Sequence, residues 1–442
     1  MSYTGVFYCN LESIEIMAIK KKSYQKCLDK IYKLGRFGIK LELDTIQNIL
    51  NLLDNPEKQY NLVHVAGTNG KGSTATYIAS ILQMAGFKTG VYTSPHLVKF
   101  NERMTINGEP ISNDDVVSAY EAVHQVDTGE RKATFFEIAT AMGFYHFAKK
   151  NVEWAVIETG MGGRFDATNI INPEVSVITN LSIEHTDYLG NTIKALAKEK
   201  GGIIKANTPV VTAVSQPSGL KAIKKTAKQN SSDLYIYKKD FSIRKNPGQN
   251  TYSYKGLKQN FNHLIKPLPG EHQKENLSLA LAACELIFDN LDESLVKKGL
   301  SITRWPGRLE HIQDKPLVII DGAHNLKAAK VLGKYLSSTV KDKKLTLVLG
   351  ILDDKPHEKM LESLVPYAQN IIITKAKIDR SLEPSVLKKA VQEITKKPVT
   401  IIEDVKKAVT HAIEISNEED AVCIAGSLYV AGEAREQLII KN

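Results

Sequence analysis

The feature that most constrains this chain is a glycine-rich loop set between an apolar run and a helical pattern. Residues 61–66 read NLVHVA, which is typical of a buried strand, and residues 73–87 repeat apolar side chains at helical spacing. Between them, GTNGKG permits tight backbone turns and points several backbone N–H groups toward the helix start, where the helix dipole favours an anion. This order predicts a sheet-based domain that binds phosphate groups at the end of a strand.

The loop departs from the common phosphate-binding spacing, G-x-x-x-x-G-K-[ST]. Val65 stands where the first glycine is expected, and Gly72 separates Lys71 from Ser73. Lys71 can still neutralise phosphate charge, and the hydroxyl of Ser73 can reach a metal. The alternative is a glycine turn capped by Ser or Thr, with Lys71 solvated. The residues predicted to bind the phosphates are Gly67, Thr68, Asn69, Gly70, Lys71, Gly72, Ser73 and Thr74.

Apolar runs alternate with helical patterns along most of the 442 residues, which is typical of a parallel sheet covered by helices. Between residues 240 and 266, alternation and turn residues predict a small antiparallel insertion. Pro306 and Gly307 mark a linker, and a second strand–helix series begins beyond it. We predict an α/β fold with two domains. The ATP-binding domain, residues 1–300, has a mostly parallel sheet, and a smaller Rossmann-like domain spans residues 301–442.

Polar side chains follow several predicted strands. Glu158 ends one apolar run and His185 follows the next, so the two side chains are expected at the ligand-binding edge of one sheet. The functional hypothesis is that both side chains bind one metal ion. Against it, imidazole is an unusual ligand for Mg²⁺, and a lone histidine is more often structural. In the second domain, Asp321 and His324 beside Arg308 suit the binding of a nucleotide or a carboxylate. The alternative is that Asp321 caps the next helix.

Composition excludes several classes of protein. The net charge of +9 favours anionic partners, but the lysine clusters lack interleaved aromatics, so we expect nucleotides and polycarboxylates rather than nucleic acid. There is no apolar run of membrane-spanning length, and the N-terminus lacks a signal-peptide core, although Met17 is an alternative start. Four scattered cysteines have neither metal nor redox spacing, which favours reduced thiols and a cytoplasmic location.

Nine motifs in order resemble one family over nearly the whole chain. They are HVAGTNGKGST, YTSPHLVKFNER, ETGMGGRFDATN, ITNLSIEHTDYLG, KEKGGIIK, LPGEHQKENLSLAL, WPGRLE, DGAHN and AGSLYVAGEARE. The chain is thereby similar to the folylpolyglutamate synthase/dihydrofolate synthase family, which belongs to the Mur ligase superfamily. That family's own phosphate loop is G-T-N-G-K-G-S, which accounts for the unusual spacing. Leu326 is a departure, because proline is common after DGAHN.

The resemblance implies an ATP-dependent ligase that adds L-glutamate to the carboxylate of dihydropteroate or of a reduced folate through an acyl phosphate. Lys71 would contact the β- and γ-phosphates, and Mg²⁺ would be held by Ser73, Glu158 and His185. Lys200 matches a lysine that becomes carbamylated and joins the metal site, although composition alone would place it on an exposed helix end. The residues implied to contact ATP beyond the loop are His272, Gln273, Asn276, Arg308 and Asp321.

The resemblance also implies the remaining catalytic and binding residues. His324 would lie near the meeting point of glutamate and the acyl phosphate, so Lys71, Lys200 and His324 are the expected catalytic residues. RFDATN resembles the RLDATN of bifunctional members, which favours a bifunctional enzyme over a folylpolyglutamate synthase alone. The residues implied to bind the folate or pterin are Ser94, Pro95, His96, Phe136, Arg164, Asp166 and Ala167. We further expect a monomer, and the resemblance leaves room for a monovalent cation.

Two other functions compete with this one. A cell-wall Mur ligase carries an additional N-terminal domain for a UDP-sugar, and the roughly sixty residues before the loop are too few for one. A switch or motor NTPase would have a standard loop and a Walker B aspartate. Glu158 and the carbamylation-type Lys200 do not fit such an NTPase, so this alternative is disfavoured as well.

Overall fold

The computed structural model of the chain describes residues 20, 22–37, 42–183 and 186–440. The chain folds into two compact units. The first comprises the described residues up to His96, then Phe100–Ile265 and Glu275–Ile302. The second contains Thr303 onward, and also Leu97–Lys99 and Lys266–Lys274, which a single boundary near residue 300 would assign to the first domain. Leu97 belongs there because it packs on the second unit's core, close against Gly307 and Gly432.

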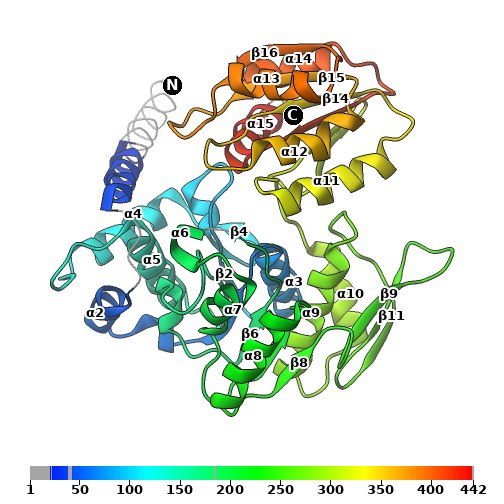
Figure 1. The fold of residues 1–442 in the computed structure, drawn as a ribbon. Helices are drawn as coiled ribbons and strands as arrows, with labels where there is room; N and C mark the ends of the chain where they lie inside the picture. The colour runs from blue at the N-terminus through cyan, green and yellow to red at the C-terminus, as the bar shows by residue number, and fades with distance from the viewer. Residues whose placement is uncertain (1–19, 21, 38–41, 184–185, 441–442) are drawn as a thin grey trace, which may run out of the picture. The chain divides into compact units, whose positions relative to one another are not determined.

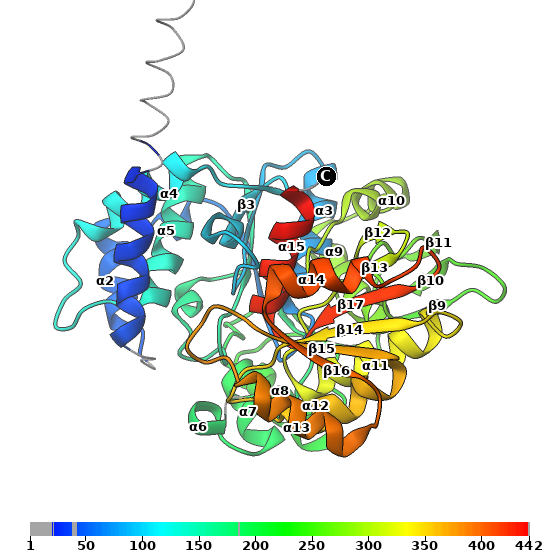
Figure 2. The same ribbon diagram turned by 90° about the horizontal axis from the view of Figure 1, so that it is seen from above.

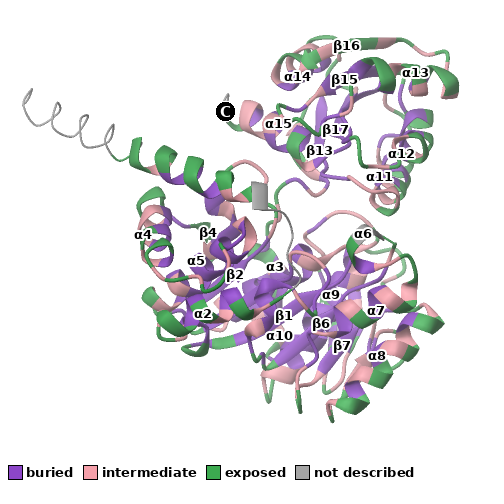
Figure 3. Cartoon of the chain, turned by 60° about the vertical axis from the view of Figure 1, so that its left-hand side comes forward, coloured by how far each residue is buried: buried purple, intermediate pink, exposed green. Residues whose placement is uncertain are grey.

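The first unit is built on an eight-stranded sheet in the order β4-β3-β2-β5-β1-β6-β7-β8. The strands are β1 (Asn61–Ala66), β2 (Thr89–Tyr92), β3 (Met104–Ile106), β4 (Glu109–Pro110), β5 (Trp154–Glu158), β6 (Val175–Ile178), β7 (Val210–Thr212) and β8 (Leu234–Ile236). Strand β3 pairs antiparallel with both β2 and β4, and all the other pairs in this sheet are parallel. Central strands such as β1, β6 and β7 are buried (Figure 3), as near-continuous apolar runs require. Because β1 lies between β5 and β6, the chain leaves it at the point where strand order reverses, where open sheets bind ligands.

Helices cover both faces of this sheet (Figure 1). They are α2 (Asp44–Leu52), α3 (Lys71–Met84), α4 (Asn113–His124), α5 (Phe135–Lys149), α6 (Thr186–Leu189), α7 (Ile193–Gly201), α8 (Pro217–Gln229), α9 (Gln273–Ile287) and α10 (Glu293–Ile302). One apolar core includes α2, α5 and the helical residues 22–33, and another includes α7 and α8. Helix α5 begins at a capping box, in which Thr134 and Glu137 satisfy each other's backbone N–H groups.

The alternating segment near residue 250 forms its own three-stranded antiparallel sheet. It contains β9 (Ser242–Lys245), β10 (Tyr252–Lys255) and β11 (Asn260–Leu264), with β10 in the middle. Figure 2 shows these strands side by side. Glu285 on α9 accepts hydrogen bonds from the Tyr254 hydroxyl and from the backbone N–H groups of residues 257–259. The insertion is therefore attached to α9 through one buried carboxylate.

The second unit is a six-stranded sheet in the order β12-β13-β17-β14-β15-β16, in which β12 alone runs antiparallel. Its strands are β12 (Glu310–Asp314), β13 (Leu317–Ile320), β14 (Leu345–Leu349), β15 (Asn370–Lys375), β16 (Val399–Asp404) and β17 (Ala421–Ala425). Its helices are α11 (Leu326–Thr339), α12 (His357–Leu364), α13 (Pro384–Ile394), α14 (Val405–Glu414) and α15 (Leu428–Ile440). Figure 2 shows α11 to α13 on one face and α14 and α15 on the other, where two separate apolar cores lie. The predicted two-domain α/β fold with mostly parallel sheets is confirmed.

Two further features of the described residues concern membrane-spanning helices and cysteines. None of the described helices is long and apolar enough to cross a membrane. Cys27, Cys284 and Cys423 are buried free thiols, and burial raises the pKa of each.

Candidate active site

The phosphate loop joins the end of β1 to the start of α3. Gly70 precedes the helix with a φ of 84°, a left-handed conformation that glycine adopts without steric cost. A Cβ at this position would lie 2.2 Å from Asn276 Oδ1, so the loop and the amide of α9 are in close contact. Ser73 and Thr74 follow in the first turn of α3, where backbone N–H groups and the helix dipole favour an anion.

The residues after β6 hold this loop in shape. Asn180 accepts from the Thr68 N–H through its carbonyl (2.9 Å) and from the Asn69 N–H through Oδ1 (3.2 Å). Its Nδ2 donates to the Asn69 carbonyl at 2.9 Å, and Thr179 Oγ1 donates to the same carbonyl at 2.7 Å. Asn180 is part of the ITNLSIEHTDYLG motif, but nothing in the sequence indicated that it fixes the loop's backbone.

Lys71 and Glu158 meet beside the loop. Lys71 Nζ donates to the carbonyls of Gly67 (3.2 Å) and Thr68 (3.3 Å), and it lies 3.8 Å from Glu158 Oε1. Glu158 ends β5, is 5% exposed and accepts from the Ser94 N–H at 3.4 Å. Glu158 therefore lies at the sheet edge that carries the phosphate loop, and its role as a metal ligand stays a prediction.

Lys200 is buried, with 1% of its surface exposed, although its charge-mixed sequence looks like an exposed helix end. It lies in the last turn of α7, and its Nζ donates to the Gly67 carbonyl at 2.9 Å. Composition misled here because Leu196 and Ala197 turn this face of α7 toward the core. Two lysines thus converge on the carbonyl of Gly67.

Two of the residues predicted to hold a metal, Ser73 and Glu158, offer oxygen atoms. Ser73 and Glu158 are both buried, and next to them in sequence the buried hydroxyls of Thr74 and Thr159 have no hydrogen-bond partner among the described residues. Hydroxyl and carboxylate oxygens suit a hard divalent cation. Within the described ranges no three His, Cys, Asp or Glu side chains gather as a preformed metal centre. His185, the remaining predicted donor, lies outside the described residues.

The residues predicted to bind the acid substrate lie on two loops and, in the case of Phe136, in the first turn of α5. In the loop after β5, the Asp166 carboxylate accepts from Met161 N–H (2.7 Å) and Thr168 Oγ1 (2.6 Å), and burial raises its pKa. Phe136 packs so closely on Gly160 that a Cβ there would lie 2.4 Å from the ring. The other predicted residues here are Arg164, which donates to Glu199 at 2.7 Å, and Ala167, which is buried at the start of the 3-10 turn Ala167–Ile170.

The second loop, Ser94 to His96, adjoins an aromatic cluster that includes Tyr32, a residue that no sequence motif indicated. Arg103 Nε donates to His96 Nδ1 at 2.8 Å, and burial with the Arg103 charge lowers the pKa of His96 to about 3. Tyr32 stacks on Phe135 at 5.9 Å between centroids, and the Arg103 guanidinium lies 5.0 Å from the Phe135 centroid. Flat apolar faces beside hydrogen-bonding groups suit a planar heterocycle. Pro95 lies between the two polar residues of this loop and is exposed.

In the second unit, Asp321 follows β13 and fixes its surroundings. Its oxygens accept from the N–H groups of Leu309 (2.8 Å) and Ala323 (2.9 Å), and burial raises its pKa against the Arg308 charge. The alternative that Asp321 caps the next helix is wrong, because Asn325 Oδ1 accepts from Ala328 N–H as the N-cap of α11. That cap also starts the helix normally with Leu326, where the family commonly has proline.

The other predicted residues of the second unit are histidines and their neighbours. His324 Nδ1 lies 2.8 Å from the Gly322 carbonyl and must donate to it, since a carbonyl only accepts. Burial, helped by Lys266 and Arg308, lowers the pKa of His272 to about 4, so this imidazole is neutral near pH 7. Gln273 and Asn276 are buried at the start of α9, but only Asn276 belongs to the first unit.

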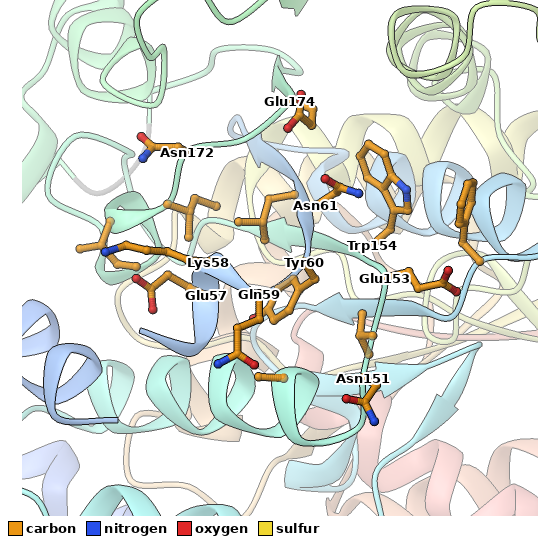
Figure 4. A pocket seen from close by; sticks show the side chains of 16 residues that line it. Glu57, Lys58, Gln59, Tyr60, Asn61, Asn151, Glu153, Trp154, Asn172 and Glu174 are labelled. Carbon is orange, nitrogen blue, oxygen red and sulfur yellow. The ribbon is translucent and has the colours of Figure 1, made fainter. Parts of the chain in front are cut away.

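A cavity of about 690 Å³ lies elsewhere on the first unit (Figure 4). Its lining includes Asn61 and Trp154, which begin β1 and β5, and Glu57 and Glu174. Strand starts lie at the edge of a parallel sheet opposite to the strand ends that carry the phosphate loop. The cavity therefore contains none of the predicted site residues, and volume alone does not locate this site.

Comparison with known proteins supports a single assignment. Two family models match, the Mur ligase middle domain over residues 65–284 and the Mur ligase glutamate ligase domain over residues 307–428. A dihydrofolate synthase/folylpolyglutamate synthase of Bacillus subtilis is 34% identical over 431 residues, 94% of this chain and 99% of that protein. A folylpolyglutamate synthase of Lacticaseibacillus casei is 32% identical over the same shares. The structure of the bifunctional enzyme of Yersinia pestis with AMPPNP and a Mn ion matches with a TM-score of 0.84 at 27% identity, over 94% of this chain and 98% of that one.

Proposed function

Because the chain belongs to the dihydrofolate synthase/folylpolyglutamate synthase family of the Mur ligases, we propose how its own residues perform ATP-dependent ligation of L-glutamate to a folate. One observation carries the assignment of roles. Lys71 and Lys200 both donate to the Gly67 carbonyl, and Glu158 lies 3.8 Å from Lys71 Nζ at the carboxyl edge of the sheet. Charged groups of both signs at a helix N-terminus are what a triphosphate with its cation requires.

The chemistry explains why such a site is needed. A carboxylate resists attack by an amine because it is negatively charged and oxide is a poor leaving group. Transfer of the γ-phosphoryl group from ATP to a carboxylate oxygen gives an acyl phosphate and ADP. The glutamate amine then attacks the carbonyl carbon, the C–O bond to phosphate breaks, and the nitrogen loses a proton. Both steps demand neutralisation of phosphate charge more than covalent help from the protein.

We assign the phosphate-side roles to residues of the first unit. Gly67 to Thr74 cradle the phosphates with backbone N–H groups, and Lys71 neutralises the β- and γ-phosphates. The oxygen donors fit Mg²⁺, which would be held by Ser73, Glu158 and His185. When bound, Mg²⁺ would supply further charge neutralisation at the phosphates. Lys200, if carbamylated, would offer a carboxylate-like group to that site, and a monovalent cation is an additional proposed ligand of the same region.

The nucleotide-binding role extends to His272, Gln273, Asn276, Arg308 and Asp321. Two geometric features support it. Asn276 contacts the phosphate loop at Gly70, and His272 is held as a neutral imidazole, which can exchange hydrogen bonds with a base without adding charge. For His324, the donated Nδ1–H fixes the ring, and we assign this residue to the step in which glutamate meets the acyl phosphate.

For the acid substrate we propose the pterin-facing residues Ser94, Pro95, His96, Phe136, Arg164, Asp166 and Ala167. Support comes from the aromatic rings beside His96 and from the ordered loop that carries Arg164 and Asp166. We propose that the enzyme accepts both dihydropteroate and reduced folates and works as a cytoplasmic monomer. The second candidate, a folylpolyglutamate synthase alone, is favoured by the single-activity name of the 32% identical Lacticaseibacillus casei relative.

The deciding experiment measures phosphate release from MgATP and L-glutamate with dihydropteroate or with tetrahydrofolate. Turnover with both acids is the expected result. Turnover with tetrahydrofolate alone would establish the second candidate. If neither acid is extended by a protein that still binds ATP, the folate assignment fails.

A further inference from the structure

A buried chain of polar side chains runs from the middle of β1 to the loop proposed to face the acid substrate. His64 on β1 is fully buried, and its Nε2 lies 2.8 Å from Thr168 Oγ1. Thr168 Oγ1 in turn donates to Asp166 Oδ1 at 2.6 Å. His64 and Thr168 are 104 residues apart in sequence, so this contact is purely tertiary.

The direction of each hydrogen bond follows from the chemistry of the groups. Asp166 accepts from Thr168 N–H (3.1 Å) as well as from the Thr168 hydroxyl and Met161 N–H. Three donors on one carboxyl group fit the ionised form, which only accepts. The Thr168 hydroxyl has one hydrogen and gives it to Asp166, so toward His64 its oxygen must accept. His64 therefore carries its hydrogen on Nε2.

The surroundings of the imidazole are consistent with that single proton. Its Nδ1 is buried and has no hydrogen-bond partner among the described residues. Burial and the nearby positive charge of Lys205 lower the pKa of His64 to about 3, so a second proton is disfavoured. Lys205 Nζ donates to the Asn169 carbonyl at 2.7 Å and holds the next residue of the same loop.

The loop is thereby held from both ends. Asp166 ties Met161 at its start to Thr168 near its end, and Asn169 Nδ2 donates to the carbonyls of Arg164 (2.9 Å) and Gly202 (3.0 Å). Among the hydrogen bonds named here, the one between His64 and Thr168 links the loop to β1. His64 lies three residues before Gly67 on that strand. The same strand thus ends in the phosphate loop and orients the neighbouring loop.

We propose that His64 is a positioning residue, which donates from Nε2 to Thr168 so that the Thr168 hydroxyl must donate to Asp166 and fix the loop of residues 160–170. The inference rests on the proposed function in one respect, that this loop faces the pterin end of the acid substrate. It goes beyond that function by assigning a role to two buried residues that have no expected contact with substrate.

The kinetic test uses two pairs of variants. We call the hydrogen bonds from His64 to Thr168 and from Thr168 to Asp166 the relay. Thr168→Val and His64→Leu remove the relay at nearly constant side-chain volume. Thr168→Ser keeps the hydroxyl, and His64→Gln keeps an Nε2–H donor. We expect the first pair to raise KM for the acid substrate on the order of 10-fold, since a buried donor or acceptor loses its partner. The second pair should stay within about 3-fold of the parent, and KM for ATP should change little in all four.

Thr212→Val is the matched control, because Thr212 is an equally buried hydroxyl that donates to the Ile178 carbonyl outside this loop. Its KM for the acid should not change. Equal effects of Thr168→Val and Thr168→Ser would overturn the proposal, as would a parallel rise in KM for ATP and for the acid. If Thr168→Val fails to fold, the KM values of His64→Leu decide the outcome, and if His64→Leu fails to fold, those of Thr168→Val do.

A spectroscopic readout separates failure of this inference from failure of the proposed function. Nitrogen-15 NMR of histidine-labelled full-length protein reports which ring nitrogen carries hydrogen. We expect His64 to be neutral with hydrogen on Nε2, and this signal to change in Thr168→Val. A hydrogen on Nδ1, or a ring that titrates above about pH 5, would overturn the relay even in an enzyme that extends folates. Conversely, the relay can be verified in a protein that extends neither acid.

Discussion

Replacing Glu285 on α9 by glutamine should lower the stability of the first unit. The side chain is 1% exposed, and its two oxygens accept four hydrogen bonds, from Tyr254 Oη (2.7 Å) and the N–H groups of residues 257 (2.9 Å), 258 (2.9 Å) and 259 (2.7 Å). Glutamine keeps one accepting oxygen for the N–H groups of residues 258 and 259 and presents an NH₂ group to the other two donors. The Tyr254 hydroxyl can turn and accept from that NH₂ group, but the N–H of residue 257 cannot. One orphaned buried donor costs about 1–3 kcal/mol, so the free energy of unfolding should fall by roughly that amount.

Thermal and urea denaturation followed by circular dichroism would measure this loss. At about 2–4 °C per kcal/mol for a unit of this size, the midpoint should fall by at least about 2 °C. Glu293→Gln is the control, because its partner Lys297 is 44% exposed and such surface pairs contribute under about 1 kcal/mol. An unfolding free energy of Glu285→Gln within about 0.5 kcal/mol of the parent would refute the reasoning, since it would mean that the four donors find other acceptors.

Three further outcomes are expected. Gly70→Ala forces a left-handed alanine against Asn276 and should raise KM for ATP about 10-fold or more, whereas Gly86→Ala, with a φ of 95° but open space around its Cβ, should leave that KM unchanged. Lys200→Met should lower kcat about 100-fold or more, and ¹³C-bicarbonate NMR should lose a carbamate signal that the parent shows. His146 is buried with a pKa lowered to about 4, chiefly by burial. Below pH 6.5 the unfolded chain therefore binds the extra proton, stability falls as the pH is lowered toward 4, and His146→Gln should make this fall shallower by about 1–2 kcal/mol at pH 5 in urea titrations.

Patterns that are local in sequence predicted most of the architecture. The loop after Ala66 was located because strand, glycine turn and helix follow one another directly, and backbone geometry then allows few alternatives. Glu158 and Asp321 were assigned to sheet edges because a polar residue that ends a buried apolar run has to emerge where the strand ends. In both cases the physical cause, hydrogen-bonded backbone next to apolar burial, operates within about ten residues of chain.

What the sequence did not reveal depends on contacts between distant segments. Lys200 looks solvated in its own helix and is buried only because α7 packs with that face inward, and Asn276 meets Gly70 from an element two hundred residues away. His64 is the sharpest case. A polar side chain among the buried apolar residues of this strand is costly, and that cost is reduced by the hydrogen bond to Thr168, whose hydroxyl is itself oriented by Asp166. Such a residue shows in the sequence as an exception to burial rules, and the exception indicates that a partner exists but not which residue it is. A buried polar residue on the strand that leads into a phosphate loop is thus a reason to search the loop after the neighbouring strand for its acceptor.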